Sequence, residues 1–257
     1  MLFVVIGAIL GLLFGGPAGL FAGAFIGWVA TQALKRSILG GLQVMQSDLV
    51  ETTFSVMGAV CKADSVVTRD EIRTVEKIFT MLRLQAEQRE QAKAAFNRGK
   101  QPEFDLDAAV DQFGRVSHRR APLVQLFLQL QYMAIAADGK VHPAEHAMLV
   151  RIARRLGLGE RDVSQLEALL RAAAGGPPPP GGAPTRDRLA DAYAALGVTP
   201  EATEAEIKRA YRKLISQNHP DKLAARGLPE SMRAVAEERS RELNAAYDLI
   251  KSARGII

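Results

Sequence analysis

A long uncharged segment at the N-terminus limits what this chain can fold into more than any other feature. Residues 2–30 contain no charged side chain. At a rise of about 1.5 Å per residue, about 20 apolar residues are enough to cross the hydrocarbon core of a bilayer. A cleaved signal peptide would need basic residues before the apolar segment, and none stands there. The segment therefore predicts a retained transmembrane helix over residues 1–31.

The flanking charges predict the orientation of this helix. Lys35 and Arg36 follow the apolar segment, whereas no Lys or Arg precedes it. Positive flanks stay on the cytoplasmic side of a membrane. We therefore expect a single-pass protein of the bacterial inner membrane, with a periplasmic N-terminus, a juxtamembrane segment over residues 32–47 and cytoplasmic domains beyond it.

Glycine recurs at every fourth position of the apolar segment. Residues four apart share one helix face, so these glycines would form a smooth stripe on which a second helix can pack closely. We expect a homodimer through this stripe, although membrane helices are also generally rich in glycine. Pro17 is expected to kink the helix. The stripe consists of Gly7, Gly11, Gly15, Gly19, Gly23 and Gly27.

The rest of the chain predicts an all-α protein. Aromatic residues make up only 6% of the sequence, and apolar residues in the middle of the chain recur with the period of a helix. The net charge is +5, but acidic residues alternate with the basic ones, so no nucleic-acid partner is expected. Cys61 is the one cysteine and lies in an apolar run, which indicates a buried thiol.

Residues 48–173 contain an internal repeat. Residues 63–71 and 137–145 both read Ala-Asp, then a short turn with a Val, then Glu at the third position of a helix. In the first copy, Thr68 and Glu71 form a capping box, in which each side chain pairs with a free backbone N–H of the other. Two helix–turn–helix units indicate a pseudo-symmetric helical bundle.

The repeated Ala-Asp, Val and Glu pattern resembles the TerB-like domain of tellurite-resistance proteins. The resemblance implies a possible metal site at the acidic residues. Turn formation and helix capping explain the same residues without an ion, so we expect neither metal nor cofactor here. The acidic residues are Asp64, Glu71, Asp138 and Glu145.

A string typical of zinc proteases, H-x-x-E-H, occurs at residues 142–146. Its chemistry needs both histidines on one face of a continuous helix. Pro143 favours the first position of a helix, which would place His142 at the cap, outside the helix. We therefore expect no zinc hydrolase, and metal analysis of the purified protein would test that alternative.

A Pro- and Gly-rich linker, residues 174–186, separates the middle domain from a C-terminal domain over residues 187–257. In the latter, a capping box at Thr203 and Glu206 opens a helix, and a further helix runs over about residues 229–251. Pro220 disfavours helical geometry at His219, so the two helices are expected to form a hairpin closed by a polar loop.

Four motifs of this C-terminal domain resemble a J domain: Tyr-Ala-Ala-Leu-Gly-Val from 193, Ile-Lys-Arg-Ala-Tyr-Arg-Lys-Leu from 207, His-Pro-Asp-Lys from 219 and Leu-Asn-Ala-Ala-Tyr from 243. With the N-terminal segment and the TerB-like region, the whole chain resembles the DjlA-type membrane-anchored co-chaperones. The resemblance implies a protein with no catalytic residues of its own, which stimulates the ATPase of a DnaK-type chaperone. A scaffold whose TerB-like domain binds a membrane-proximal client is a compatible alternative, and the client is unknown.

The resemblance also implies which residues bind the chaperone. The loop would engage its nucleotide-binding domain, and an exposed basic stripe on the preceding helix would orient the contact, since such charges mainly set on-rate and specificity. The loop residues are His219, Pro220, Asp221 and Lys222, and the basic stripe consists of Lys208, Arg209, Arg212 and Lys213.

Overall fold

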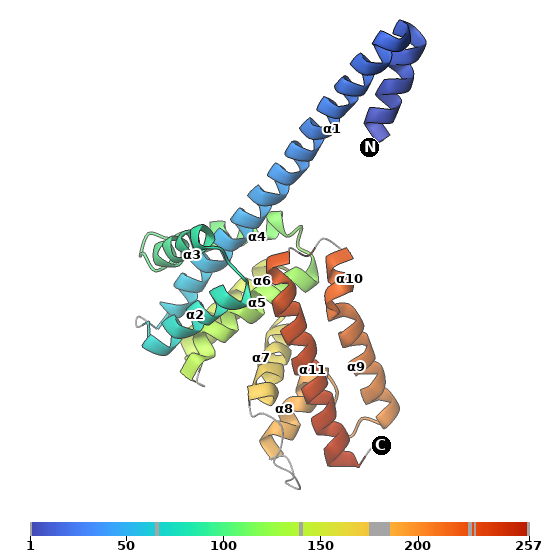
Figure 1. Ribbon diagram of the computed structural model, residues 1–257. Helices are drawn as coiled ribbons and strands as arrows, with labels where there is room; N and C mark the ends of the chain where they lie inside the picture. Colours follow the sequence, from blue (N-terminus) through green and yellow to red (C-terminus); the bar gives the residue numbers. More distant parts are fainter. Residues whose placement is uncertain are drawn as a thin grey trace. The chain divides into compact units, whose positions relative to one another are not determined.

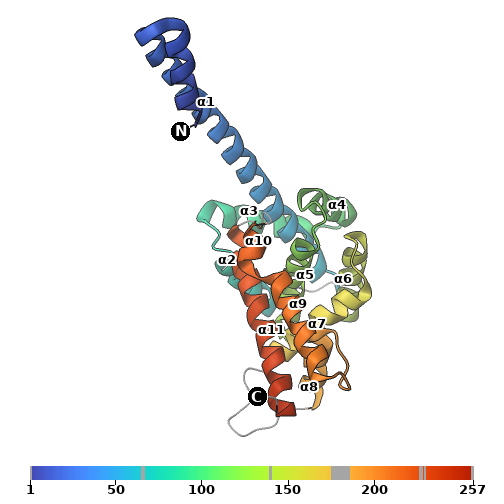
Figure 2. The same cartoon turned by 90° about the vertical axis from the view of Figure 1, so that its right-hand side faces the viewer.

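The computed structural model describes residues 2–64, 67–138, 141–174, 186–225, 228 and 230–255. Every regular element in these ranges is a helix, which confirms the all-α prediction (Figures 1 and 2). The chain divides into two compact units, residues 1–47 and residues 48–257, and each is described by itself.

The first unit is a helical hairpin rather than one kinked helix. Helix α1 (Leu2–Cys61) is interrupted at Gly16, whose φ of 60° and ψ of −152° are not helical (Figure 1). A Cβ atom placed on Gly7 would lie only 2.2 Å from the carbonyl oxygen of Gly23. The chain therefore turns back on itself, because glycine tolerates the positive φ and Pro17 cannot continue the hydrogen-bond ladder.

The expected single span does not appear as such. Among the helices of the described residues, none is both long enough and apolar enough to cross a membrane. Within the hairpin, Gly7 packs against Gly23 and Gly27, so part of the glycine stripe meets another part of the same chain. Large apolar side chains on the outside of the hairpin, such as Phe21 and Phe25, remain exposed.

The second unit begins with a helical bundle that corresponds to the TerB-like region. Helix α5 (Ala121–Ile135) is its centre, since nearly every side chain from Leu123 onward is buried. The last part of α1, residues 48–61, and the remaining helices surround it. These are α2 (Arg69–Met81), α3 (Ala86–Gly99), α4 (Leu106–Val116), the 3-10 turn η1 (Ala136–Asp138), α6 (Pro143–Arg155) and α7 (Glu160–Ala174).

Two glycines let α1 and α3 cross at very short range. A Cβ atom on Gly58 would lie 2.0 Å from the carbonyl oxygen of Phe96, and one on Gly99 would lie 1.8 Å from that of Ser55. The backbones can approach only because neither position has a side chain. The same part of α1 places Phe54 against Phe79 of α2, with ring centroids 4.9 Å apart.

Both predicted helix starts of the internal repeat are confirmed. Thr68 and Glu71 form a reciprocal capping box at the start of α2. At the start of α6, His142 is the N-cap residue and Pro143 occupies the first turn, as the zinc-protease argument required. The backbone N–H of His142 donates to Glu145 over 2.8 Å.

The C-terminal domain is a helical hairpin with two flanking helices. Its elements are α8 (Arg186–Leu196), α9 (Glu204–Asn218), α10 (Pro220–Ala225), the 3-10 turn η2 (Glu230–Met232) and α11 (Arg233–Arg254). Ile207, Leu243 and Ile250 are fully buried between the helices. The predicted capping box at Thr203 and Glu206 opens α9.

This domain shares its hydrophobic core with the bundle. Leu169 and Ala172 of α7 belong to the same buried cluster as Tyr193 and Leu196 of α8. Gln165 also donates to the carbonyl oxygen of Ala195 over 2.9 Å. Most of the predicted linker, residues 175–185, lies outside the described residues, but the helices on either side of it pack directly on each other.

Candidate functional site

The loop motif occupies the junction between α9 and α10. His219 is the C-cap residue of α9 and has an extended backbone, with φ −62° and ψ 125°. The backbone N–H of Asp221 donates to Nδ1 of His219 over 3.2 Å, so the imidazole lies over the turn. The His219 side chain is 48% exposed and that of Asp221 is 73% exposed. Both are therefore accessible to a partner.

The prediction that residues 219–222 form an irregular loop is wrong in part. Pro220 opens the short helix α10, because its fixed φ suits the first position of a helix, where its missing N–H is not needed. Lys222 of α10 donates from Nζ to the hydroxyl of Ser216 in α9 over 2.6 Å. Arg233 lies 3.5 Å from Asp221, an exposed pair that links α10 to α11.

The predicted basic stripe lies on the outer face of α9. Its four side chains are exposed, and none of them forms a hydrogen bond or a salt bridge with any other described residue. The opposite face of α9 packs on α11, where Tyr211 stacks on Tyr247 with ring centroids 4.1 Å apart. Tyr211 also donates to Asn244 over 2.9 Å. Packing on one side therefore directs the positive charges to solvent on the other side.

Beneath the loop lies a buried polar cluster that the sequence analysis missed. Asn218, the residue before His219, accepts a hydrogen bond from Nε of Arg239 over 2.9 Å. Arg239 also donates to Gln129 of α5, and Gln129 donates to Glu242. Burial lowers the pKa of Arg239 to about 10 and raises the pKa of Glu242 to about 7. Gln129, one of three glutamines in the mainly apolar α5, is a sequence signal that could have indicated this cluster.

Three acidic residues of the repeat, Asp64, Glu71 and Glu145, line a cavity of about 300 Å³ in the bundle. Glu71 and Glu145 are buried, and each accepts a hydrogen bond from the backbone of its own cap residue. Burial, together with the neighbouring Glu71, raises the pKa of Glu145 to about 7, and burial raises the pKa of the Cys61 thiol. Within the described ranges, no three His, Cys, Asp or Glu side chains are placed to hold a metal ion, and the Asp138 side chain lies outside them.

The two histidines of the H-x-x-E-H string serve separate purposes. Nδ1 of His142 accepts the N–H of Ala144 over 3.4 Å at the cap. Nδ1 of His146 lies 2.7 Å from a carboxylate oxygen of Glu167 on α7. The geometry therefore opposes the zinc-hydrolase alternative.

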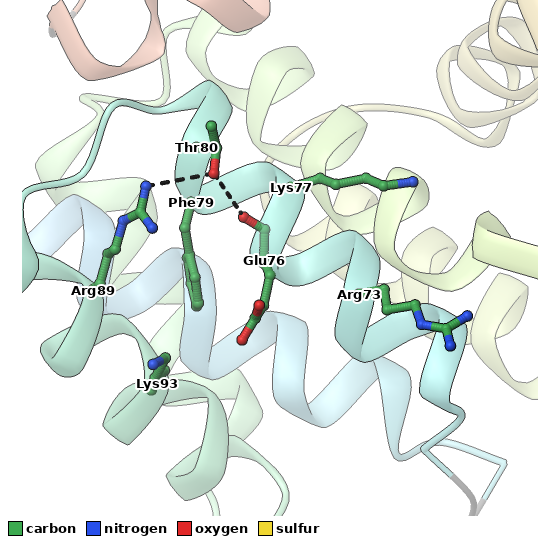
Figure 3. A pocket seen from close by; sticks show the side chains of 7 residues that line it. All are labelled: Arg73, Glu76, Lys77, Phe79, Thr80, Arg89 and Lys93. Atoms are coloured by element: carbon green, nitrogen blue, oxygen red, sulfur yellow. Dashed lines mark hydrogen bonds between the residues drawn. The ribbon is translucent and has the colours of Figure 1, made fainter.

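A cationic groove runs between α2 and α3. Figure 3 shows its lining side chains, with Thr80, Phe79 and Glu76 of the first helix on the side of Arg89 and Lys93 of the second, while Arg73 and Lys77 point away from them. The groove encloses about 550 Å³, and Arg89 bridges the two helices by donating to Thr80 over 3.4 Å (Figure 3). Its lining contains four cations and one carboxylate, and two of the cations, Arg73 and Lys93, form salt bridges with Asp70 and Glu90 beside the groove. The lining residues are Arg73, Glu76, Lys77, Phe79, Thr80, Arg89 and Lys93.

Comparison with known proteins agrees with this two-domain description. Residues 51–168 match the family model of the tellurite resistance protein TerB, and residues 191–254 match that of the DnaJ domain. The co-chaperone protein DjlA of Photobacterium profundum is 41% identical over 98% of both chains. The chain belongs to the DjlA family of co-chaperones.

Other DjlA proteins match over similar lengths. That of Coxiella burnetii is 35% identical over 98% of both chains, and that of Shewanella oneidensis is 40% identical over 85% of this chain and 83% of its own. No solved structure matches the chain. As a DjlA co-chaperone the chain is not an enzyme, and its J domain implies a DnaK-type chaperone as partner.

Proposed function

We propose that this DjlA co-chaperone stimulates the ATPase of a cytoplasmic DnaK-type chaperone through the loop around His219. The observation that carries this proposal is the exposure of His219 and Asp221 at the end of α9, the helix whose outer face carries the four exposed cations of the basic stripe. The basic stripe would attract an acidic surface of the chaperone, and the loop would make the contact that triggers hydrolysis. Long-range charge attraction and a short-range trigger are then carried by different residues of one surface.

Single-turnover ATP hydrolysis by the chaperone tests this function. The full chain should accelerate hydrolysis, and His219→Gln should remove the acceleration while the fold is kept, because the imidazole is half exposed and its hydrogen bond is to the adjacent turn. His142→Asn is the matched control, since asparagine also caps helices and His142 lies in the bundle. Unchanged stimulation by His219→Gln would contradict the proposal.

We further propose that residues 1–31 anchor the protein in the bacterial inner membrane, with a periplasmic N-terminus and cytoplasmic domains. The absence of charge in residues 2–30 and the exposed apolar side chains of the hairpin support an apolar environment for this segment. The contact of Gly7 with Gly23 favours a second arrangement, a hairpin that enters and leaves the same side of the membrane. Accessibility of an N-terminal tag from the periplasm distinguishes the two arrangements, since only a span exposes it there.

The TerB-like domain is proposed to recruit a membrane-proximal partner or client. The cationic groove supports this role, because its lining holds four cations against one carboxylate and, among the described residues, only Arg73 and Lys93 pair with nearby acids, so Lys77 and Arg89 would suit an acidic segment of a partner protein. A photo-crosslinker at Thr80 in native membranes should form adducts that disappear when Lys77 and Arg89 are both replaced by Glu. Adducts that persist in this variant would move the partner site elsewhere.

A further inference from the structure

The seam between the TerB-like bundle and the J domain contains four buried polar side chains. They are Gln129 of α5, Asn218 of α9, and Arg239 and Glu242 of α11, and each is less than 9% exposed. Gln129 accepts a hydrogen bond from Arg239 over 3.3 Å and donates one to Glu242 over 2.9 Å. One side chain of the bundle therefore pairs with both Arg239 and Glu242, the two buried charged residues of α11.

Such a cluster is a costly way to hold two domains together. Desolvating a guanidinium costs several kcal/mol, and apolar residues of similar volume often hold a seam equally well. The apolar contact of α7 with α8 already joins the domains through Leu169 and Ala172. The polar cluster is therefore better explained by a role other than holding the domains together. Its hydrogen bonds fix the orientation of the four side chains relative to one another.

Asn218 connects the cluster directly to the His219 loop. Its side chain donates to the carbonyl oxygen of Leu214 over 2.9 Å, which closes the last turn of α9, and it accepts from Arg239. Its backbone carbonyl accepts from the Ser240 hydroxyl of α11 over 3.4 Å. The next residue in the chain is His219. Arg239 thus holds Asn218, the residue that precedes the exposed loop, and Gln129 in turn orients Arg239.

We infer that Gln129 and Arg239 are positioning residues, through which the TerB-like domain holds the His219 loop in the geometry that triggers the chaperone. The inference rests on the proposed ATPase stimulation. Neither residue contacts the chaperone, since both are buried. The middle domain then acts on the efficiency of the J domain in addition to recruiting a partner.

The chain supplies a matched control for this inference. Gln131 lies two residues after Gln129 in the same helix and is equally buried, but it donates to the carbonyl oxygen of Thr53 inside the bundle. Gln129→Met and Gln131→Met therefore make the same change at the same depth. Only the first removes a contact with the J domain.

The experiment compares these full-length variants in single-turnover hydrolysis and in hydrogen exchange of residues 218–223. Gln129→Met should lower the maximal stimulated rate by about three- to tenfold, the scale expected for one lost buried contact, and should leave the half-saturating concentration within about twofold. Exchange at the loop should accelerate. Gln131→Met should change neither quantity, and Arg239→Met combined with Gln129→Met should cost no more than Arg239→Met alone.

Equal effects of the two glutamine variants, or full stimulation with unchanged exchange in Gln129→Met, would overturn the inference. Where the methionine variant does not fold, Gln129→Asn and Gln131→Asn form the corresponding pair. If the wild-type chain itself fails to stimulate hydrolysis, the proposed function fails, and the exchange data still decide whether Gln129 positions the loop.

Discussion

Glu71 and Glu145 occupy the same third position in two capping boxes, and their carboxyl groups meet inside the bundle, where burial together with the neighbouring Glu71 raises the pKa of Glu145. The repeat seen in the sequence thus becomes a contact in space. Each carboxylate stabilises its own helix start, but two negative charges in one buried place repel each other. The consequence is a dependence of stability on pH.

The first prediction concerns Glu145. Its folded pKa of about 7 lies above its ordinary value of 4.5, so its contribution to stability is present below about pH 4.5 and is lost as the pH rises through about 7. Glu145→Gln keeps an acceptor for the His142 N–H and removes the charge beside Cys61, Asp64 and Glu71. The melting temperature should rise by roughly 2–4 °C at pH 8, the shift that about 1 kcal/mol causes in a domain of this size, and should change little at pH 4.5.

Glu206 has a lowered pKa, in contrast to Glu145, so the pH dependence of the melting temperature should have the opposite sign. It holds the third position of the exposed capping box of α9, and its hydrogen bonds to Thr203 lower its pKa. Its contribution is therefore present at neutral pH and is lost as the pH falls through the lowered pKa. Glu206→Gln should slightly lower the melting temperature at pH 8. A stabilising effect of both substitutions would show that removal of negative charge in general is responsible.

The second prediction concerns the basic stripe. Replacing Arg212 and Lys213 by Glu should weaken chaperone binding by about tenfold at low salt, because these cations have no partner among the described residues and are free to meet an acidic surface. The wild-type affinity should fall as salt rises, since exposed charges are screened over roughly 8–10 Å near physiological ionic strength. Titration at several salt concentrations measures both effects. Arg161→Glu with Arg186→Glu is the control of equal charge, and an equal loss there would remove the docking role of the stripe.

The third prediction concerns the glycine stripe. Gly15→Leu with Gly19→Leu should reduce self-association measured in membranes, because bulky side chains would prevent close approach of two helices. Phe21→Leu with Phe25→Leu changes the exposed apolar face instead and should leave association intact. Undiminished association of the glycine variant would mean that the stripe serves the internal contact of Gly7 with Gly23 and no contact between chains.

The fourth prediction concerns the shared core of bundle and J domain. Leu169→Ala should destabilise the J domain by about 2–5 kcal/mol, because Leu169 is fully buried against α8 although it lies before the linker. Leu170→Ala, at the neighbouring and partly exposed position, should cost clearly less. Hydrogen exchange of α8 and α11 in the full chain measures the difference. Unchanged protection of both helices in Leu169→Ala would show that the J domain is stable without α7.

The sequence by itself determined the features that depend on neighbours a few residues apart. The capping boxes at Thr68 and Thr203 and the cap position of His142 could be predicted because a cap is a hydrogen bond between residues two or three positions apart. The extended backbone of His219 could be predicted because Pro220 acts on the residue before it. The exposure of the basic stripe followed from the helical period. The local conformation at His219 and the exposed position of the basic stripe could therefore both be predicted from the sequence.

The tertiary structure alone decided which distant surfaces meet. Gln129 and Glu242 are 113 positions apart, and no local rule relates them. The return of Gly7 onto Gly23 required a positive φ at Gly16, a choice that the glycine-rich segment permits at several positions and that packing selects. The linker composition indicated separate domains, whereas the apolar faces of α7 and α8 bury each other. Burial of complementary faces depends on the whole fold, and so the seam that connects the bundle to the His219 loop could be found only in three dimensions.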